Sequence, residues 1–137
     1  MYSTALAAMA MELESSGAET RGEVALLRQA VEAAEVAVVG IGHAQPGDKT
    51  VVDALHPVVE AFRRAEEAST DLPGAIISAM DAAESGAAGT ADLVARVGRA
   101  SRLGERSWGL PDAGATSFAI IVRAVADAYL RPAAGDE

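Results

Sequence analysis

Two polar, glycine-rich segments carry the residues of this chain that are best suited to bind an anion. The first runs from Gly42 to Leu55 and the second from Gly98 to Ser117, and each leads into an alanine-rich stretch with helical spacing. The N–H groups at the start of a helix have no partner inside it, and the positive end of the helix dipole lies there too. Two such segments in one small chain indicate a phosphate-bearing ligand, most simply a nucleotide.

The first segment nearly matches the phosphate-binding pattern G-x-x-x-x-G-K-[ST]. Gly42 and Gly47 have the required spacing, but Asp48 stands between Gly47 and Lys49, so the lysine comes one residue late. A carboxylate at that place would face the phosphates, and the preceding residues continue a helical pattern from Val24 where the motif needs a strand. The motif is therefore disfavoured. A plain connection between two helices, with Asp48 capping the second, stays open beside an anion-binding role.

The second segment is long and rich in arginine. Arg99, Arg102 and Arg106 stand near Trp108 and Asp112. A long loop without secondary structure in a compact helical domain is usually functional or disordered. Arginine forms charge-assisted hydrogen bonds with phosphate, and the tryptophan could cover an adenine ring or simply pack against the fold.

Composition limits the classes of protein to which the chain can belong. Its 137 residues fit one domain, residues 1–137, and 50% of them are hydrophobic while only 4% are aromatic. The net charge of −9 argues against nucleic acid and against anionic membranes as partners. There is no cysteine, and the longest uncharged apolar run, Val36 to Ile41, is too short to span a bilayer. With no signal-peptide pattern at the start, a cytoplasmic protein is expected.

The spacing of apolar residues predicts an all-α fold of five or six antiparallel amphipathic helices and no strand. Pro57 falls inside the third helix, and Gly86 and Gly89 are expected to interrupt the fourth. The predicted helices cover residues 1–15, about 20–39, 49–68, a stretch that begins after Asp71, a restart from Thr90 through Val97, and 115–130.

Five short motifs occur in order along the chain: Gly47-Asp-Lys-Thr50, Asp53-Ala-Leu-x-Pro57, Gly98-Arg-Ala-Ser101, Leu103-Gly-Glu-Arg-Ser107 and Asp112-x-Gly-Ala-Thr-Ser117. In this order and at these separations they resemble the nucleotide-binding L subunit of dihydroxyacetone (glycerone) kinase, the DhaL family. The resemblance covers residues 2–130. It implies a barrel of eight antiparallel helices, with a nucleotide and Mg²⁺ at the end built from interhelical loops.

The resemblance also implies which residues bind ADP or ATP. Arg99 matches an arginine on the phosphate side, and Asp112, Ala113 and Gly114 match a triplet that contacts the nucleotide largely through backbone, with Ala113 in place of a proline. No catalytic residue is predicted. The full predicted set is Gly42, Gly47, Asp48, Lys49, Thr50, Val51, Arg99, Asp112, Ala113 and Gly114.

The family binds Mg²⁺ through aspartates of a loop that would come before Tyr2, so the resemblance implies that the metal ligands are missing from this chain. We therefore expect only part of the barrel, weak or no binding of Mg-ADP by the chain alone, no ketose phosphorylation by it, and self-association through apolar helix faces. Asp48 and Asp53 are expected to cap or to accept hydrogen bonds, and His43 to be solvated.

The function implied is that of the ADP- or ATP-binding subunit of a dihydroxyacetone kinase. In that family a K subunit or domain holds a short ketose, and the L part presents the phosphoryl donor. The donor is ATP in one form and, in another, ADP rephosphorylated by a phosphotransferase-system protein. The alternative that remains open is a non-catalytic helical remnant that acts as an interaction module.

Overall fold

The protein is a bundle of antiparallel α-helices. The computed structural model describes residues 1–15 and 22–132. Within these residues there is no β-strand, which confirms the all-α prediction. The elements are α1 (Tyr2–Ser15), α2 (Glu23–Gly42), α3 (Val52–Glu67), α4 (Leu72–Gly89), α5 (Ala113–Leu130) and two 3₁₀ segments, η1 (Thr90–Asp92) and η2 (Arg99–Ser107).

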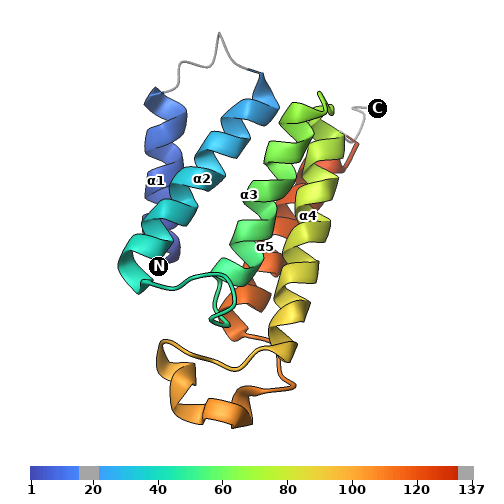
Figure 1. The fold of residues 1–137 in the computed structure, drawn as a ribbon. Helices are drawn as coiled ribbons and strands as arrows, with labels where there is room; N and C mark the ends of the chain where they lie inside the picture. The colour runs from blue at the N-terminus through green and yellow to red at the C-terminus, as the bar shows by residue number, and fades with distance from the viewer. Residues whose placement is uncertain (16–21, 133–137) are drawn as a thin grey trace.

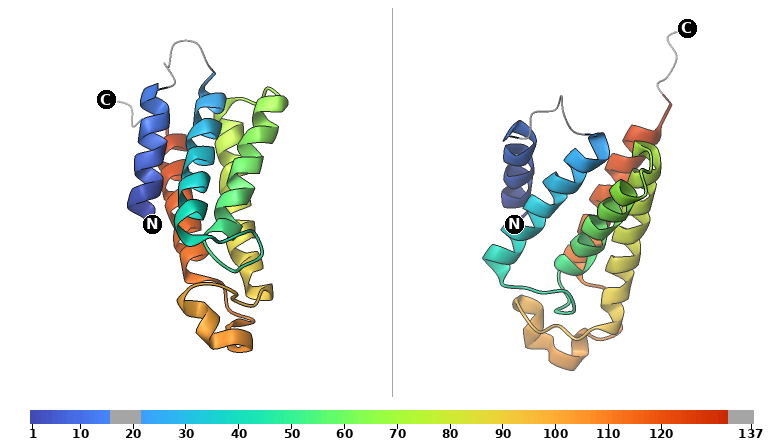
Figure 2. Two further views of the ribbon diagram at one scale, coloured as in Figure 1. Left: turned by 60° about the vertical axis from the view of Figure 1, so that its left-hand side comes forward. Right: turned by 45° about the horizontal axis from the view of Figure 1, so that its top comes forward.

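Helix α3 occupies the middle of the bundle. It packs against α2 on one side and against α4 and α5 on the other, while α1 packs mainly on α2 (Figures 1 and 2). Its central place follows from a broad apolar face, whose residues become buried in the fold. They are Val52, Ala54, Leu55, Val58, Val59, Ala61, Phe62 and Ala65.

Helix α4 meets α3 through very small side chains. Its buried residues recur every fourth position as a stripe of alanines: Ala75, Ala79, Ala83 and Ala87. Gly86 lies beside this stripe, and a Cβ there would overlap the backbone oxygen of Asp53 and lie 3.0 Å from the Cα of Ala54. The absence of a side chain at Gly86 therefore permits the close approach of the two helices.

The expected interruptions of the fourth helix are confirmed only in part. Gly86 does not interrupt α4, whereas α4 does end at Gly89 and a short 3₁₀ segment follows from Thr90. The helix predicted from Thr90 through Val97 is also wrong, because η1 ends at Asp92 and Leu93 is extended, with φ −101° and ψ 154°. The backbone beyond this point is used in contacts with other segments instead. One of them is the hydrogen bond from the Arg96 amide to the carbonyl of Asp48, with an N···O distance of 3.3 Å.

Three further helix boundaries bear on the predictions. The third helix begins at Val52 and not at Lys49, because the residues before it form a turn. The start of the second helix near Thr20 lies outside the described residues, and the helix as described begins at Glu23. The second loop, predicted to lack structure, contains η2, which is broken at Gly104 (φ 53°, ψ −129°).

Helix α5 is less covered than α3. Among the described helices it alone is long and apolar enough to cross a membrane by length and composition, over residues 113–130. It also carries Arg123 and Asp127, which are costly in a bilayer, so one such helix is weak evidence for a span. Its buried residues are alanines that pack in the bundle, namely Ala115, Ala119 and Ala126.

Candidate functional site

The two segments singled out in the sequence lie at the same end of the bundle. The connection from α2 to α3 and the long connection from α4 to α5 both lie at the lower end of the molecule in Figure 1. The other views in Figure 2 keep them together. We call residues 43–51 the first loop and residues 93–107 the arginine segment. The start of α5 lies at this end as well.

The first loop has a backbone that bends sharply and is fixed from within. Gly47 and Lys49 have positive φ values of 97° and 62°. The carboxylate of Asp53 accepts hydrogen bonds from the amides of Gly47, at 2.5 Å, and Thr50, at 2.8 Å. The amides of two residues predicted to bind the nucleotide are thus already paired with a carboxylate of the protein itself.

The predicted role of Asp48 as the cap of the third helix is wrong. The N-cap residue of α3 is Val51, and it makes no side-chain cap hydrogen bond. The carboxylate of Asp48 instead accepts a hydrogen bond of 2.9 Å from the amide of Gln45, within the loop. Asp53, in the first turn of α3, reaches back to organise the loop in its place.

Lys49 joins the first loop to the arginine segment. Its side chain is buried, with 4% of the residue exposed. The ammonium donates to the carbonyl oxygen of Leu93, at 3.0 Å, and to that of Ser107. A left-handed backbone costs a residue with a side chain roughly 1–2 kcal/mol, so these bonds must outweigh a local strain.

Ser107 is a second buried point in this connection. Its hydroxyl accepts from the amide of Ala95, at 3.0 Å, and donates to the carbonyl of Gly104, at 2.7 Å. The two ends of the arginine segment are therefore tied to each other as well as to Lys49. The hydrogen-bonding role of Asp53 was expected from the sequence, but the structural roles of Lys49 and Ser107 were not. Nothing in the local sequence pattern marks either of them as buried.

The arginine segment carries positive charge that the fold leaves available. Arg96, Arg99, Arg102 and Arg106 are all exposed. Elsewhere Arg28, Arg63 and Arg123 pair with glutamates of neighbouring helices, as shown by the 2.8 Å bond from Arg63 to Glu32. None of the four arginines of the segment has a salt bridge within residues 1–15 and 22–132. In a chain of net charge −9, this is a local concentration of unpaired positive charge.

The start of α5 lies against the first loop. Asp112 caps the helix by accepting a 2.8 Å hydrogen bond from the amide of Ala115. Its own amide donates to the hydroxyl of the fully buried Thr90, at 2.7 Å. A Cβ placed on Gly114 would lie 3.7 Å from the Cβ of Val51, so these two predicted site residues are neighbours.

Helix α1 also reaches this end of the bundle. The hydroxyl of Tyr2 donates to the carbonyl of Gly114, at 3.0 Å. Burial is the main reason why the pKa of the Tyr2 phenol is raised above its ordinary value, so the group stays protonated and able to donate. A tyrosine at the first position of a helix gave no signal for this contact in the sequence.

The predicted residues differ in what their side chains can still do. Gly47 to Val51 and Asp112 to Gly114 are brought together, and Arg99 is exposed on the segment beside them. Lys49 is committed to backbone carbonyls, and Asp112 to its cap. Gly42 is the exposed last residue of α2, and a Cβ added to it would meet no other atom within 4 Å.

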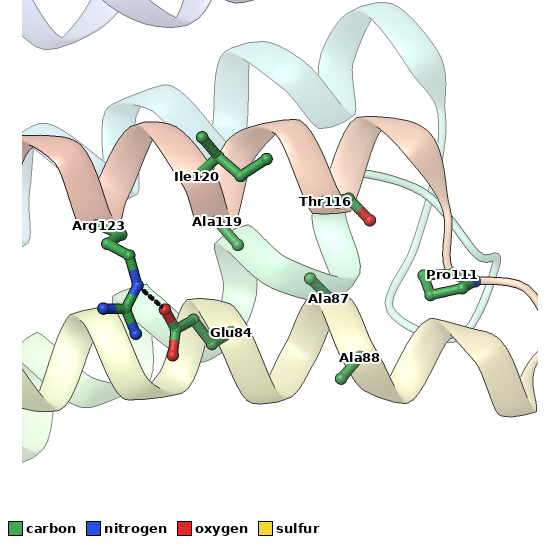
Figure 3. A pocket seen from close by; sticks show the side chains of 8 residues that line it. All are labelled: Glu84, Ala87, Ala88, Pro111, Thr116, Ala119, Ile120 and Arg123. Carbon is green, nitrogen blue, oxygen red and sulfur yellow. Dashed lines mark hydrogen bonds and ion pairs between the residues drawn. The ribbon is translucent and has the colours of Figure 1, made fainter.

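A shallow groove lies between α4 and α5 (Figure 3), and none of the predicted residues lines it. It has a volume of about 290 Å³. An ion pair between Arg123 and Glu84 crosses it, and the hydrogen bond from Arg123 holds the pKa of Glu84 below its ordinary value. Since most of its lining residues are apolar, the groove offers little polar recognition. It is lined by Glu84, Ala87, Ala88, Pro111, Thr116, Ala119, Ile120 and Arg123.

The acidic and histidine side chains do not gather into a metal centre in the described part of the chain. No group of three His, Asp or Glu there is placed to hold an ion. Asp53 and Asp48 each accept from backbone amides, and His56 pairs with Glu35 at 2.7 Å. The described residues therefore do not fit a magnesium site among themselves.

Comparison with known proteins identifies related chains. A family model described as the DAK2 domain matches residues 1–127. The chain is 39% identical over 127 residues to D-erythrulose kinase of Mycolicibacterium smegmatis, covering 93% of this chain and 21% of that protein. It is 42% identical over 109 residues to L-erythrulose kinase of Pectobacterium atrosepticum, covering 80% of this chain and 18% of that protein.

A further relative is itself a subunit. The chain is 46% identical over 89 residues to the ADP-binding subunit DhaL of the PEP-dependent dihydroxyacetone kinase of Escherichia coli, covering 65% of this chain and 42% of that subunit. The chain therefore spans less than half of the length of each of these three relatives.

Proposed function

Because this chain belongs to the DAK2 domain family, we propose that it is the nucleotide-binding part of a kinase that phosphorylates a short ketose. It holds ADP or ATP, and the ketose is dihydroxyacetone or a ketotetrose. The ADP-binding DhaL subunit among the relatives supports the nucleotide, and the two erythrulose kinases support the ketotetrose.

The observation that carries this proposal is the set of unpaired arginines on the arginine segment, which lies at the same end of the bundle as the first loop and the start of α5. Guanidinium groups bind phosphate oxygens through paired, charge-assisted hydrogen bonds. Arg99 and its neighbours lack carboxylate partners in residues 1–15 and 22–132, so no ion pair within the described protein has to break when a phosphate binds. The net charge of −9 would otherwise repel a polyphosphate.

The proposed roles combine this geometry with the motif resemblance. Arg99 binds the phosphates, together with the N–H groups of Ala113 and Gly114, which open α5 and have no partner inside that helix. Gly42, Asp48 and Val51 contact the rest of the nucleotide. Because Asp53 already pairs with the amides of Gly47 and Thr50, these two residues shape the first loop more than they grip the ligand.

The proposed partners and setting also follow from the family. A K subunit or domain holds the ketose, and a phosphotransferase-system protein is a further proposed partner, since the DhaL relative belongs to a PEP-dependent kinase. Such a complex works in the cytoplasm. We expect the chain alone to bind Mg-ADP weakly and to phosphorylate no ketose, because the described residues form no magnesium site.

A specific observation supports the alternative of an interaction module. Large apolar side chains are exposed along α1 and α5, and a face of this kind on a small protein often marks a binding surface. Self-association through these residues stays a prediction. The exposed residues are Leu6, Met11, Leu13, Ile120, Ile121, Val125 and Tyr129.

Equilibrium titration of ADP into residues 1–137 tests the proposed function. We expect measurable binding at millimolar ADP, and Arg99→Ala should weaken it by about 1–3 kcal/mol because a charge-assisted bond is lost. His43→Ala is the control, since His43 is exposed at the end of α2 and is outside the predicted set. No binding at millimolar ADP would favour the interaction module. A larger effect of His43→Ala than of Arg99→Ala would mean that the nucleotide lies elsewhere between the two loops.

A further inference from the structure

Lys49 is the only lysine among the chain's 11 basic residues, the other ten being arginines. It is also the buried one at this end of the bundle, whereas the four arginines of the arginine segment are exposed. A buried ammonium is costly unless its protons are hydrogen-bonded, and a compact group with three donors suits a pocket lined by carbonyls. Its environment therefore favours a structural role over contact with a ligand.

The partners of the ammonium have a particular arrangement. Leu93 and Ser107, whose carbonyls accept its hydrogen bonds, are the first and last residues of the arginine segment. Arg96, Arg99 and the other two arginines all lie between them. One side chain thus fixes both ends of the segment to the first loop, and fixing the ends of a loop restricts the residues between them.

The backbone at this position gives an independent argument. Lys49 has φ 62°, a conformation that glycine adopts without strain. If the position served only to turn the chain, glycine would serve at least as well as lysine. What glycine cannot provide is the side chain that reaches Leu93 and Ser107.

We propose that Lys49 is a positioning residue, which holds the arginine segment in the place where Arg99 meets the ligand and does not contact the ligand itself. The proposal rests on the proposed function for the identity of the ligand. The connection between the two loops stands on the hydrogen bonds alone. It departs from the sequence-based prediction that Lys49 binds the nucleotide.

Two substitutions of Lys49 distinguish the effect of its side chain from the effect of its backbone conformation. Lys49→Gly relieves the strained φ and removes the ammonium, while Lys49→Met keeps the length of the side chain and removes the donors. Ser69→Gly is the matched control, because Ser69 also has a positive φ, of 54°, but is exposed in the turn between α3 and α4. Circular dichroism verifies that each variant keeps its helices.

Amide hydrogen exchange of the segment is the first readout. In both Lys49 variants, protection of residues 93–107 should fall by about tenfold or more, as expected for loss of hydrogen bonds to a charged group. Protection within α3 and α4 should remain, and Ser69→Gly should leave the segment unchanged. Protection of residues 93–107 at the unmutated level in Lys49→Gly would overturn the proposal.

The unmutated chain offers a second readout that does not depend on the folding of a variant. With a single lysine, ¹⁵N-labelled protein gives one side-chain ammonium signal. The proposal expects its protons to exchange slowly with water, both without ADP and at saturating ADP. An ammonium that exchanges as fast as that of free lysine would contradict the proposal.

ADP affinity tests the positioning role of Lys49 together with the proposed nucleotide-binding function. Lys49→Met should lower the affinity by about tenfold although Arg99 is intact, because the segment loses its anchor. An unchanged affinity would overturn the positioning role. If the unmutated chain binds no ADP, the proposed function fails, whereas the exchange measurements still decide whether Lys49 holds the segment.

Discussion

The first loop and the arginine segment lie at the same end of the molecule but are held in place differently. The first loop is fixed from beneath, by the carboxylate of Asp53 and by the buried side chains of Ala44, Lys49 and Val51. The arginine segment buries only Ala95 and Ser107 and leaves its arginines in solvent. The first loop is thus a base for the site, while the segment supplies its charge.

This difference shows how a small acidic protein can offer positive charge without destabilising its core. Exposed arginines keep their hydration, and the segment that carries them needs few contacts of its own. The cost is that its position depends on a few hydrogen bonds to a neighbouring loop. Changes to the base of the first loop should therefore affect stability, and changes to the arginines mainly binding.

Gly86→Ala should have the largest effect on stability. The added Cβ would overlap the backbone oxygen of Asp53, directly beneath the first loop. Overpacking costs about 1–3 kcal/mol, and an overlap with a backbone oxygen belongs at the upper end of that range. Alanine returns up to about 1 kcal/mol of helix propensity, so we expect a net loss of about 2 kcal/mol in the free energy of unfolding. Denaturant unfolding measures it.

Gly89→Ala is the control for this change. Gly89 is the last residue of α4, and no atom lies within 4 Å of a side chain added there. This variant should be neutral or more stable by up to about 1 kcal/mol. Equal unfolding free energies for the two variants would show that α3 and α4 are not in close approach beneath the loop.

Asp53→Asn should have a smaller effect, confined to the first loop. The carboxylate accepts through both oxygens, whereas an amide keeps one acceptor, so either Gly47 or Thr50 loses its partner. We expect a loss of about 1 kcal/mol in unfolding free energy and faster amide exchange in residues 43–51.

Asp48→Asn is the control for Asp53→Asn in the measurement of unfolding free energy. Its carboxylate accepts from the amide of Gln45, a contact that an asparagine can keep. It should therefore be closer to neutral. If the two substitutions destabilise equally, Asp53 is not the residue that organises the loop.

Much of the fold could be predicted from the spacing of apolar residues. The pattern from Val24 onward predicts α2, and the cap at Asp71, which accepts from Gly74 at 3.0 Å, marks the start of α4. These features are local, because caps and helical faces depend on residues a few positions apart. The errors arise where distant segments decide. From the sequence alone, Gly86 suggests a helix break. Its real role, to let α4 approach the backbone of Asp53, cannot be read locally because Asp53 is remote along the chain.

The site could be predicted in position but not in detail. Glycines mark both loops and arginines mark the second one, because conformational freedom and charge are properties of the residues themselves. The burial of Lys49 could not be foreseen, since it depends on carbonyls 44 and 58 residues away. That Asp53 accepts from two amides of the first loop while Asp48 accepts from one likewise follows from how the loop folds back on α3.

Chemical-shift mapping of ADP on ¹⁵N-labelled protein measures whether the two loops form one nucleotide site. If they do, the amides of Val51, Arg99 and the Ala113–Gly114 turn shift together, with one dissociation constant. Shifts confined to the groove between α4 and α5, around Glu84 and Ile120, would contradict it, as would no shifts at millimolar ADP.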